Sequence, residues 1–131
     1  MADNITVDAP LQSNSVTPSR YLIPLLLNDA AQQTEVIVTI NNFVIALLFN
    51  LNPLDNNLYL SAYTLNKSII YFAGFRCVFG NYINLIDNGC PYLFYFLDES
   101  NLQTYVNSDF PINFDAISNG VNLYAEFRQT I

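Results

Sequence analysis

The 131-residue sequence contains no histidine and no tryptophan, and it has no Gly-rich phosphate loop, no GxSxG and no HExxH motif. Histidine is the commonest general base and a frequent metal ligand, and without it neither cysteine can be paired with an imidazole for nucleophilic catalysis. Classical hydrolase sites are therefore excluded. We predict that the protein is not an enzyme and that it uses no cofactor.

Pairs of carboxylates leave one catalytic alternative open. Asp98 with Glu99, or Asp109 with Asp115, stand near aromatic residues, as the two acids of a glycosidase do. Adjacent residues of a strand point to opposite faces, which weakens the first pair. Because acids in loops are usually solvent-exposed, we expect these four side chains to have no catalytic role.

Cysteine is also scarce, with Cys77 and Cys90 as its two examples. Two cysteines without histidine leave a tetrahedral metal site short of ligands. Residues 1–10 lack the basic segment and apolar core of a secretory signal, so we expect the chain to stay in the cytoplasm or to be assembled there into something larger. There the thiols are expected to be reduced and buried, with a disulfide as the rarer alternative.

Charged residues make up only 11% of the chain, against the roughly 25% that is typical of soluble domains. With four cations and a net charge of −7, the chain has little with which to bind nucleic acid phosphates. No apolar run reaches the ~20 residues of a membrane span. The sequence therefore predicts no nucleic-acid binding, no membrane span and a largely uncharged surface that suits a subunit of an assembly.

The composition changes after residue 19. Residues 1–19 are rich in Asp, Asn, Ser, Thr and Pro, so we expect an extended arm that a neighbouring subunit could order. From residue 20 onward, short apolar segments alternate with turn residues and no helical period persists. Residues 20–131 are therefore predicted to form a single all-β domain, a small antiparallel barrel or sandwich of about seven strands.

The predicted strands are separated by turns rich in Asn and Gly, and they occupy residues 20–27, 34–40, 43–51, 58–65, 68–79, 92–98 and 121–127. Asn41–Asn42 and Asn66–Lys67 are predicted to form two-residue turns, because Asn tolerates the positive φ that such turns require. Gly74 and Gly80 are expected to bend the sheet. The polar connection 99–119 is expected to lie over an end of the domain. In the last strand we expect one set of side chains to point inward: Val121, Leu123, Ala125 and Phe127.

Strand 43–51 is apolar on both faces. Phe43, Ile45, Leu47 and Phe49 share one face, while Val44, Ala46 and Leu48 share the other. We infer that the chain has more apolar strand surface than a lone molecule of this size could hide. The predicted subunit contacts lie on the second face, at two strand tyrosines and in the arm: Val44, Ala46, Leu48, Tyr63, Tyr71, Pro10, Val16 and Pro18.

Four stretches follow one another in the sequence: IPLLLNDAAQQTEVIVTINNFVIALLFN, NNLYLSAYTLNKSIIYFAG, NYINLIDNGCPYLFYFLD and NGVNLYAEF. This succession resembles the baseplate plug family of contractile-tailed bacteriophages, whose members run from a proline-containing strand through a Gln-Thr-led strand and a tight hairpin to a short final strand. The chain departs from that pattern at Asn41–Asn42, where the family often has a glycine turn, and at Leu58–Tyr59, where an aromatic pair would stand.

The resemblance implies a virion component at the junction of tail tube and baseplate, assembled in the host cytoplasm. It also implies other tail and baseplate subunits and the tail tube as partners, with copies of this chain in a ring. An acidic wall would suit a channel along which DNA slides without adhering. Two alternatives remain, a capsid or capsid-decoration protein, and a carbohydrate-binding module that uses exposed aromatic residues such as Tyr92, Tyr95 and Tyr105.

Overall fold

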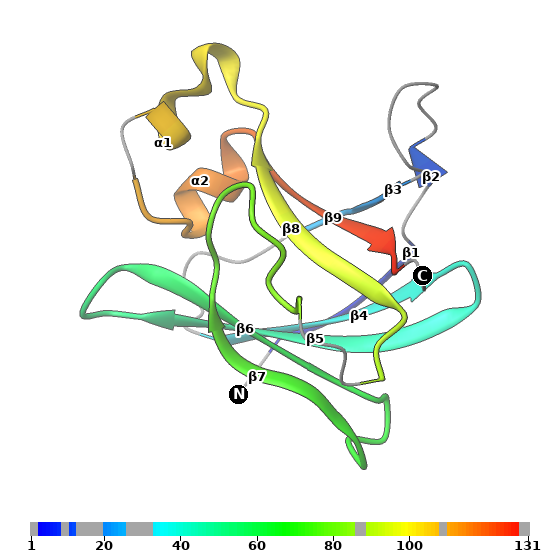
Figure 1. The fold of residues 1–131 in the computed structure, drawn as a ribbon. Helices are drawn as coiled ribbons and strands as arrows, with labels where there is room; N and C mark the ends of the chain where they lie inside the picture. The colour runs from blue at the N-terminus through cyan, green and yellow to red at the C-terminus, as the bar shows by residue number, and fades with distance from the viewer. Residues whose placement is uncertain are drawn as a thin grey trace.

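The protein forms a β-sandwich in which a larger and a smaller sheet pack face to face (Figure 1). A computed structural model describes residues 3–8, 11–12, 20–25, 33–85, 89–107 and 110–128, the first two ranges by their backbone alone. The predicted all-β sandwich is confirmed.

Cys77 and Cys90 are separate thiols, both buried between the sheets, and burial raises the pKa of Cys77.

The larger sheet has the strand order β1-β4-β5-β6-β7. Its strands are β1 (Asp3–Asp8), β4 (Gln33–Ile40), β5 (Phe43–Asn52), β6 (Asn57–Tyr63) and β7 (Ile70–Arg76). β1 runs parallel to β4, and the other neighbours are antiparallel. This sheet therefore consists of consecutive hairpins with one strand added from the N-terminal region.

The smaller sheet has the order β2-β3-β9-β8 and is antiparallel throughout. Its strands are β2 (Leu11–Gln12), β3 (Arg20–Ile23), β9 (Val121–Phe127) and β8 (Tyr92–Asp98). The seven strands β3 to β9 lie within residues 20–131, while β1 and β2 lie within the predicted arm. Three contact residues predicted in that arm lie outside the described residues: Pro10, Val16 and Pro18.

The connection between β8 and β9 contains the only helices of the described residues, and Figure 1 shows α1 and α2 at one end of the sandwich. They are the 3₁₀ helix η1 (Asn101–Gln103), α1 (Thr104–Asn107) and α2 (Phe114–Ser118). Gly120 ends this connection with a φ of 112°, and a Cβ atom there would lie 2.8 Å from the Ser100 Cα. Glycine is therefore needed both for its backbone conformation and for this close approach.

The hairpin of β4 and β5 follows the predicted turn. Asn41 and Asn42 have φ values of 47° and 72°, as a primed two-residue turn requires. The buried side chains alternate along β4, and Val36, Val38 and Ile40 have no exposed surface. On β5 the inward residues Ile45, Leu47 and Phe49 are likewise fully buried, as predicted.

The prediction of a two-residue turn at Asn66–Lys67 is wrong, because β6 ends at Tyr63 and β7 begins at Ile70. The side chain of Asn66 accepts hydrogen bonds from the Ser68 N–H and hydroxyl groups, and this local bonding widens the turn to six residues.

Further along, Gly74 has a φ of 69° and the β6–β7 register shifts, so the predicted bend of this strand is confirmed.

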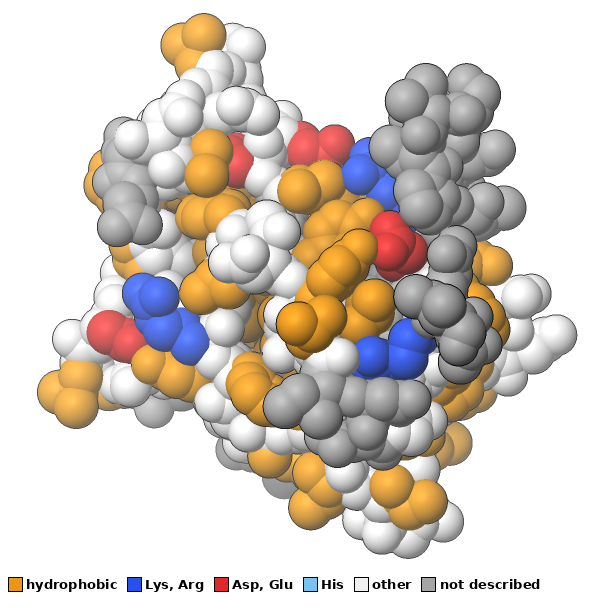
Figure 2. All heavy atoms as spheres, viewed as in Figure 1, with side chains coloured by type: hydrophobic (Ala, Val, Ile, Leu, Met, Phe, Trp, Pro, Cys, Tyr) orange, Lys and Arg blue, Asp and Glu red, His pale blue; other side chains and the backbone are white. Residues whose placement is uncertain are grey.

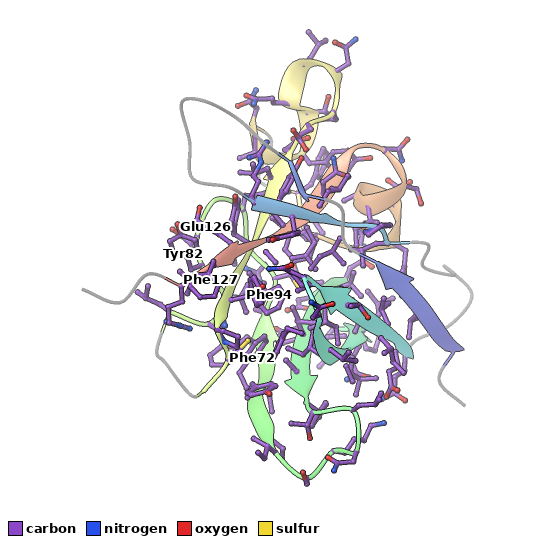
Figure 3. The ribbon with its side chains drawn as sticks, turned by 90° about the vertical axis from the view of Figure 1, so that its right-hand side faces the viewer. Phe72, Tyr82, Phe94, Glu126 and Phe127 are labelled. Atoms are coloured by element: carbon purple, nitrogen blue, oxygen red, sulfur yellow. The ribbon has the colours of Figure 1, made fainter. Side chains whose placement is uncertain are left out.

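The core lies between the two sheets, and Figure 3 shows Phe72 and Phe94 meeting there. Phe94 is fully buried, and its ring centroid lies 6.1 Å from that of Phe72. Phe127, which was predicted to point inward, is 57% exposed. Its cross-strand partner Tyr92 contacts it edge to face at 5.6 Å and is buried, whereas Phe127 ends β9 beyond Glu126, the last residue that pairs with β3.

Candidate subunit interface

The side of the larger sheet that faces away from the smaller sheet carries a row of apolar side chains on three adjacent strands. Ile37, Ala46 and Tyr63 lie opposite one another on β4, β5 and β6, and Val44 and Leu48 flank Ala46 on β5. We call these five residues the outer sheet face. Outward positions of an antiparallel sheet that meets water are normally polar, so this face has the character of an interface.

The five residues of the outer sheet face differ in how much of their side chains is exposed. Val44 is 37% exposed, and Ile37, Leu48 and Tyr63 are half-buried. Ala46 is only 1% exposed, because its methyl group lies between the larger side chains of its neighbours Ile37 and Tyr63. Of the three β5 positions predicted as contacts, Val44 and Leu48 are therefore accessible to a partner, whereas Ala46 is buried beneath its neighbours.

An ion pair lies beside the outer sheet face. Lys67 Nζ is 2.9 Å from the carboxylate of Glu35, which stands opposite Leu48. Lys67 belongs to the β6–β7 loop, so the contact draws this loop over the outer side of the sheet. The same region exposes Leu65, Ile69 and Ile70 at 54%, 53% and 58%. The Lys67 side chain is 52% exposed and that of Glu35 is 12% exposed, so water screens the pair on the lysine side, and the contact serves to position the apolar loop.

Tyr71, which was predicted as a contact, does not join the outer sheet face. Its ring lies 6.1 Å from that of Phe43 and packs against the core. The register shift between β6 and β7 places Ile70 opposite Tyr63 and Phe72 opposite Ala62. Ile70 therefore extends the outer sheet face, whereas Tyr71 is the extra residue of the bulge.

The smaller sheet carries a second ordered cluster on its outer face, which the sequence did not predict. The Arg20 guanidinium lies 4.1 Å from the centre of the Tyr124 ring, Tyr124 stacks on Tyr95 at 5.8 Å, and Tyr95 meets Tyr82 edge to face at 5.5 Å. We call these four residues the tyrosine–arginine ladder. Tyr and Arg are enriched among the residues that dominate binding at protein interfaces.

Two carboxylates hold the tyrosine–arginine ladder in place. The Tyr82 hydroxyl donates to Glu126 at 2.7 Å, and Figure 3 shows these two side chains pointing toward each other. The Tyr124 hydroxyl donates to Glu99. The bond to Glu126 raises the pKa of Tyr82 to about 12, and burial together with Glu99 raises the pKa of Tyr124 to about 12. Both hydroxyls are therefore neutral donors at ordinary pH.

The space-filling view shows hydrophobic side chains gathered at the centre of the face that carries β8, with acidic and basic groups beside them (Figure 2). Tyr82 is 40% exposed, and Leu85 is 68% exposed. Sequence periodicity could indicate that Tyr95 and Tyr124 point outward. It could not indicate Tyr82, because this residue reaches the sheet from the loop that follows β7.

The acids considered for catalysis have separate structural partners. Asp98 is buried and accepts hydrogen bonds from the Ser100 N–H and hydroxyl groups and from the Val106 N–H. Glu99 holds Tyr124 and Asn122 instead, so these neighbouring acids do not converge. Asp115 accepts a bond from the Tyr105 hydroxyl at 3.2 Å. Asp109 lies outside the described residues.

The hydrogen bonds of Asp98 lead to a prediction about the stability of the fold at low pH. Burial acts to raise the pKa of Asp98, but the hydrogen bonds from Ser100 and Val106 hold it below the ordinary 3.8. A lowered folded-state pKa stabilises the fold above the unfolded-state pKa of about 3.9, and this stabilisation is lost as the pH falls through the folded-state pKa. We expect Asp98→Asn to lower the free energy of unfolding at pH 7 by about 1.5–3 kcal/mol.

Urea unfolding of the wild type and of Asp98→Asn at several pH values between 7 and roughly 3 tests this linkage. The difference between the two proteins should be largest at neutral pH and should narrow below about pH 4. A difference that stays constant across this range would show that the Asp98 carboxylate does not contribute in its charged form.

Comparisons of the chain with protein-family models, curated proteins and solved structures gave no match. The functional interpretation therefore rests on the residues and their geometry. Within the described ranges, no helix has the length and apolar character to cross a membrane. The described part of the chain also contains no group of three or more His, Cys, Asp or Glu side chains that could hold a metal ion.

Proposed function

We propose that this protein is a structural subunit and that neighbouring subunits cover its outer sheet face. The observation that carries the proposal is the apolar surface of Ile37, Val44, Leu48 and Tyr63 on the side of the larger sheet that does not pack on the smaller one. Burial of such surface is the main driving force of stable association.

The distribution of charge supports the same proposal. Lys67 and Arg76 pair with Glu35 and Asp55, at 2.9 Å and 3.7 Å. Arg20 lies over an aromatic ring, and Arg128 donates to the backbone carbonyls of residues 84, 85 and 90. With these cations engaged within the fold, apolar side chains, and not free positive charges, are what the described surface offers to a partner.

The finer proposal is a virion subunit at the junction of tail tube and baseplate, in contact with other tail subunits and with further copies of itself. It rests on the resemblance of the strand segments to baseplate plug proteins. A capsid or decoration protein would use the same kind of surface, and the symmetry of the assembly would separate the two. The described carboxylates are spread over both sheets and the end loops, which gives no support to a DNA channel.

Two neighbouring substitutions on β5 test the proposal. Leu48→Glu places a charge on the outer sheet face, where burial without a partner costs several kcal/mol, so we expect association to weaken by at least about 100-fold. The far-UV circular dichroism should not change. Leu47→Glu is the matched control, because Leu47 is fully buried in the core, and we expect this variant to unfold.

The measurement is molar mass by light scattering or sedimentation, for the chain alone and co-expressed with tail-tube and baseplate proteins. We expect the wild type to assemble and Leu48→Glu to sediment as a 14.8 kDa monomer. A wild type that stays monomeric in both settings, or a Leu48→Glu variant that assembles as the wild type does, would rule out the proposed interface.

A further inference from the structure

A pocket of about 220 Å³ lies at the helical end of the sandwich, between the β5–β6 turn and the β8–β9 connection. Asn56 of this turn forms one side, and residues from α1, the following loop and α2 form the other: Tyr105, Phe110, Asn113 and Asp115. We call it the end pocket. Figure 1 shows the two contributing regions one above the other.

Two aromatic rings form an apolar wall of the end pocket. Tyr105 and Phe110 meet edge to face, with ring centroids 5.9 Å apart. The Phe110 N–H donates to the Tyr105 carbonyl at 3.0 Å, which fixes these two residues relative to each other. Phe110 is 48% exposed. The electron-rich face of such a ring attracts groups with positively polarised hydrogens, such as the C–H groups of a sugar ring.

Polar groups lie next to this wall. The Asn113 side-chain oxygen accepts a bond from the Ala116 N–H at 3.0 Å, which orients the side chain and leaves its NH₂ group as a donor. The Asp115 carboxylate accepts from Tyr105 and Asn119 and has further acceptor capacity. Asn56 is held at a φ of 56°, and within the described residues no hydrogen bond occupies its side-chain amide. Donors and acceptors therefore both lie beside an aromatic wall.

The charge of the end pocket restricts the ligand. No Lys or Arg is among its lining residues, and the nearby cation Arg76 pairs with Asp55. A phosphate, uronate or sialate would meet Asp115 without a compensating charge. The volume is also below the roughly 300–1,000 Å³ of pockets for drug-sized ligands, so the pocket suits a single small ring.

We propose that the end pocket binds one neutral pyranose unit of a glycan. The sugar ring packs its C–H face on Phe110, while its hydroxyl groups bond to Asn56, Asn113 and Asp115. This site is separate from the outer sheet face. Glycan binding at the end pocket therefore does not depend on which subunits cover that face.

Saturation-transfer NMR tests this site, because it observes the ligand and works for a monomer or an assembly. The probes are the methyl glycosides of glucose, galactose, mannose and N-acetylglucosamine, with methyl glucuronide as the anionic comparator. A ligand of this size that gains about 0.3 kcal/mol per heavy atom binds with a Kd near 1 mM. We expect at least one neutral glycoside to bind in this range and the glucuronide to bind at least about tenfold more weakly.

Two variants place the signal in the end pocket. Phe110→Ala removes the stacking wall, and Asn56→Gly removes the amide while keeping the positive φ, so each should weaken binding at least about fivefold. Leu54→Ala is the matched control, because Leu54 is 95% exposed on the same turn and does not line the pocket. The proposal is overturned if no neutral glycoside binds, if the glucuronide binds equally well, or if both pocket variants bind as the wild type does.

Discussion

The Asn57→Ala variant is expected to lose about 2–5 kcal/mol of its free energy of unfolding. Asn57 is 1% exposed and joins three segments of the chain. Its amide NH₂ group donates to the carbonyls of Leu58 and Cys77, and its side-chain oxygen accepts the Ile112 N–H at 3.1 Å. Alanine leaves the buried groups of Cys77 and Ile112 without this partner, at about 1–3 kcal/mol each.

Chemical denaturation followed by circular dichroism measures this loss. Asn101→Ala is the control, because its exposed side chain lies on η1 at the surface and the change should stay within about 0.5 kcal/mol. Asn57→Ala should also loosen the end loop near Ile112, visible as faster amide hydrogen exchange there. Equal stability of the two variants would show that water replaces the lost bonds.

Phe94→Ala is expected to lower the free energy of unfolding by about 3–5 kcal/mol, a large share of the 5–15 kcal/mol of a typical domain. Phe94 has no exposed surface and lies between the sheets against Phe72. Truncation removes its buried area and leaves a cavity that closely packed strands fill only in part. The central position of Phe94 on β8 places this cavity where both sheets contribute side chains.

Phe127→Ala provides the comparison, since this variant removes the same kind of ring from a site that is 57% exposed. We expect this variant to lose less than about 1.5 kcal/mol, mostly through the contact with Tyr92. Thermal and urea unfolding of both variants measure the difference. Losses of similar size would mean that Phe127 is covered in solution, for example by another subunit.

Local patterns were sufficient to predict the β4–β5 hairpin of the larger sheet. The alternation from Thr34 to Ile40 and the Asn41–Asn42 turn depend on residues close in sequence, and both agree with the structure. The run 92–98 is continuously apolar from Tyr92 to Leu97, and β8 buries five of its seven residues. These features follow from the two-residue period of a strand and from the backbone conformations that Asn allows.

Features that depend on distant partners were not predictable. The bulge at Tyr71 turns this residue away from the outer sheet face, and no pattern within the strand indicates that shift. Tyr82 reaches Glu126 and Tyr95 across loops, and no local pattern indicates that contact. The end pocket depends on Asn56 and Asp115, which lie far apart in sequence and come together only because the β8–β9 connection folds over the β5–β6 turn.

The pairing of β3 with β9 has a consequence for the order of events during synthesis. β4 to β7 form from consecutive segments, so they can pair as they leave the ribosome, whereas Arg20 of β3 must wait for Glu126 of β9. Until β9 has been made, the apolar inner side of the growing sheet lacks its cover. We expect the nascent chain to be most prone to aggregate during this interval.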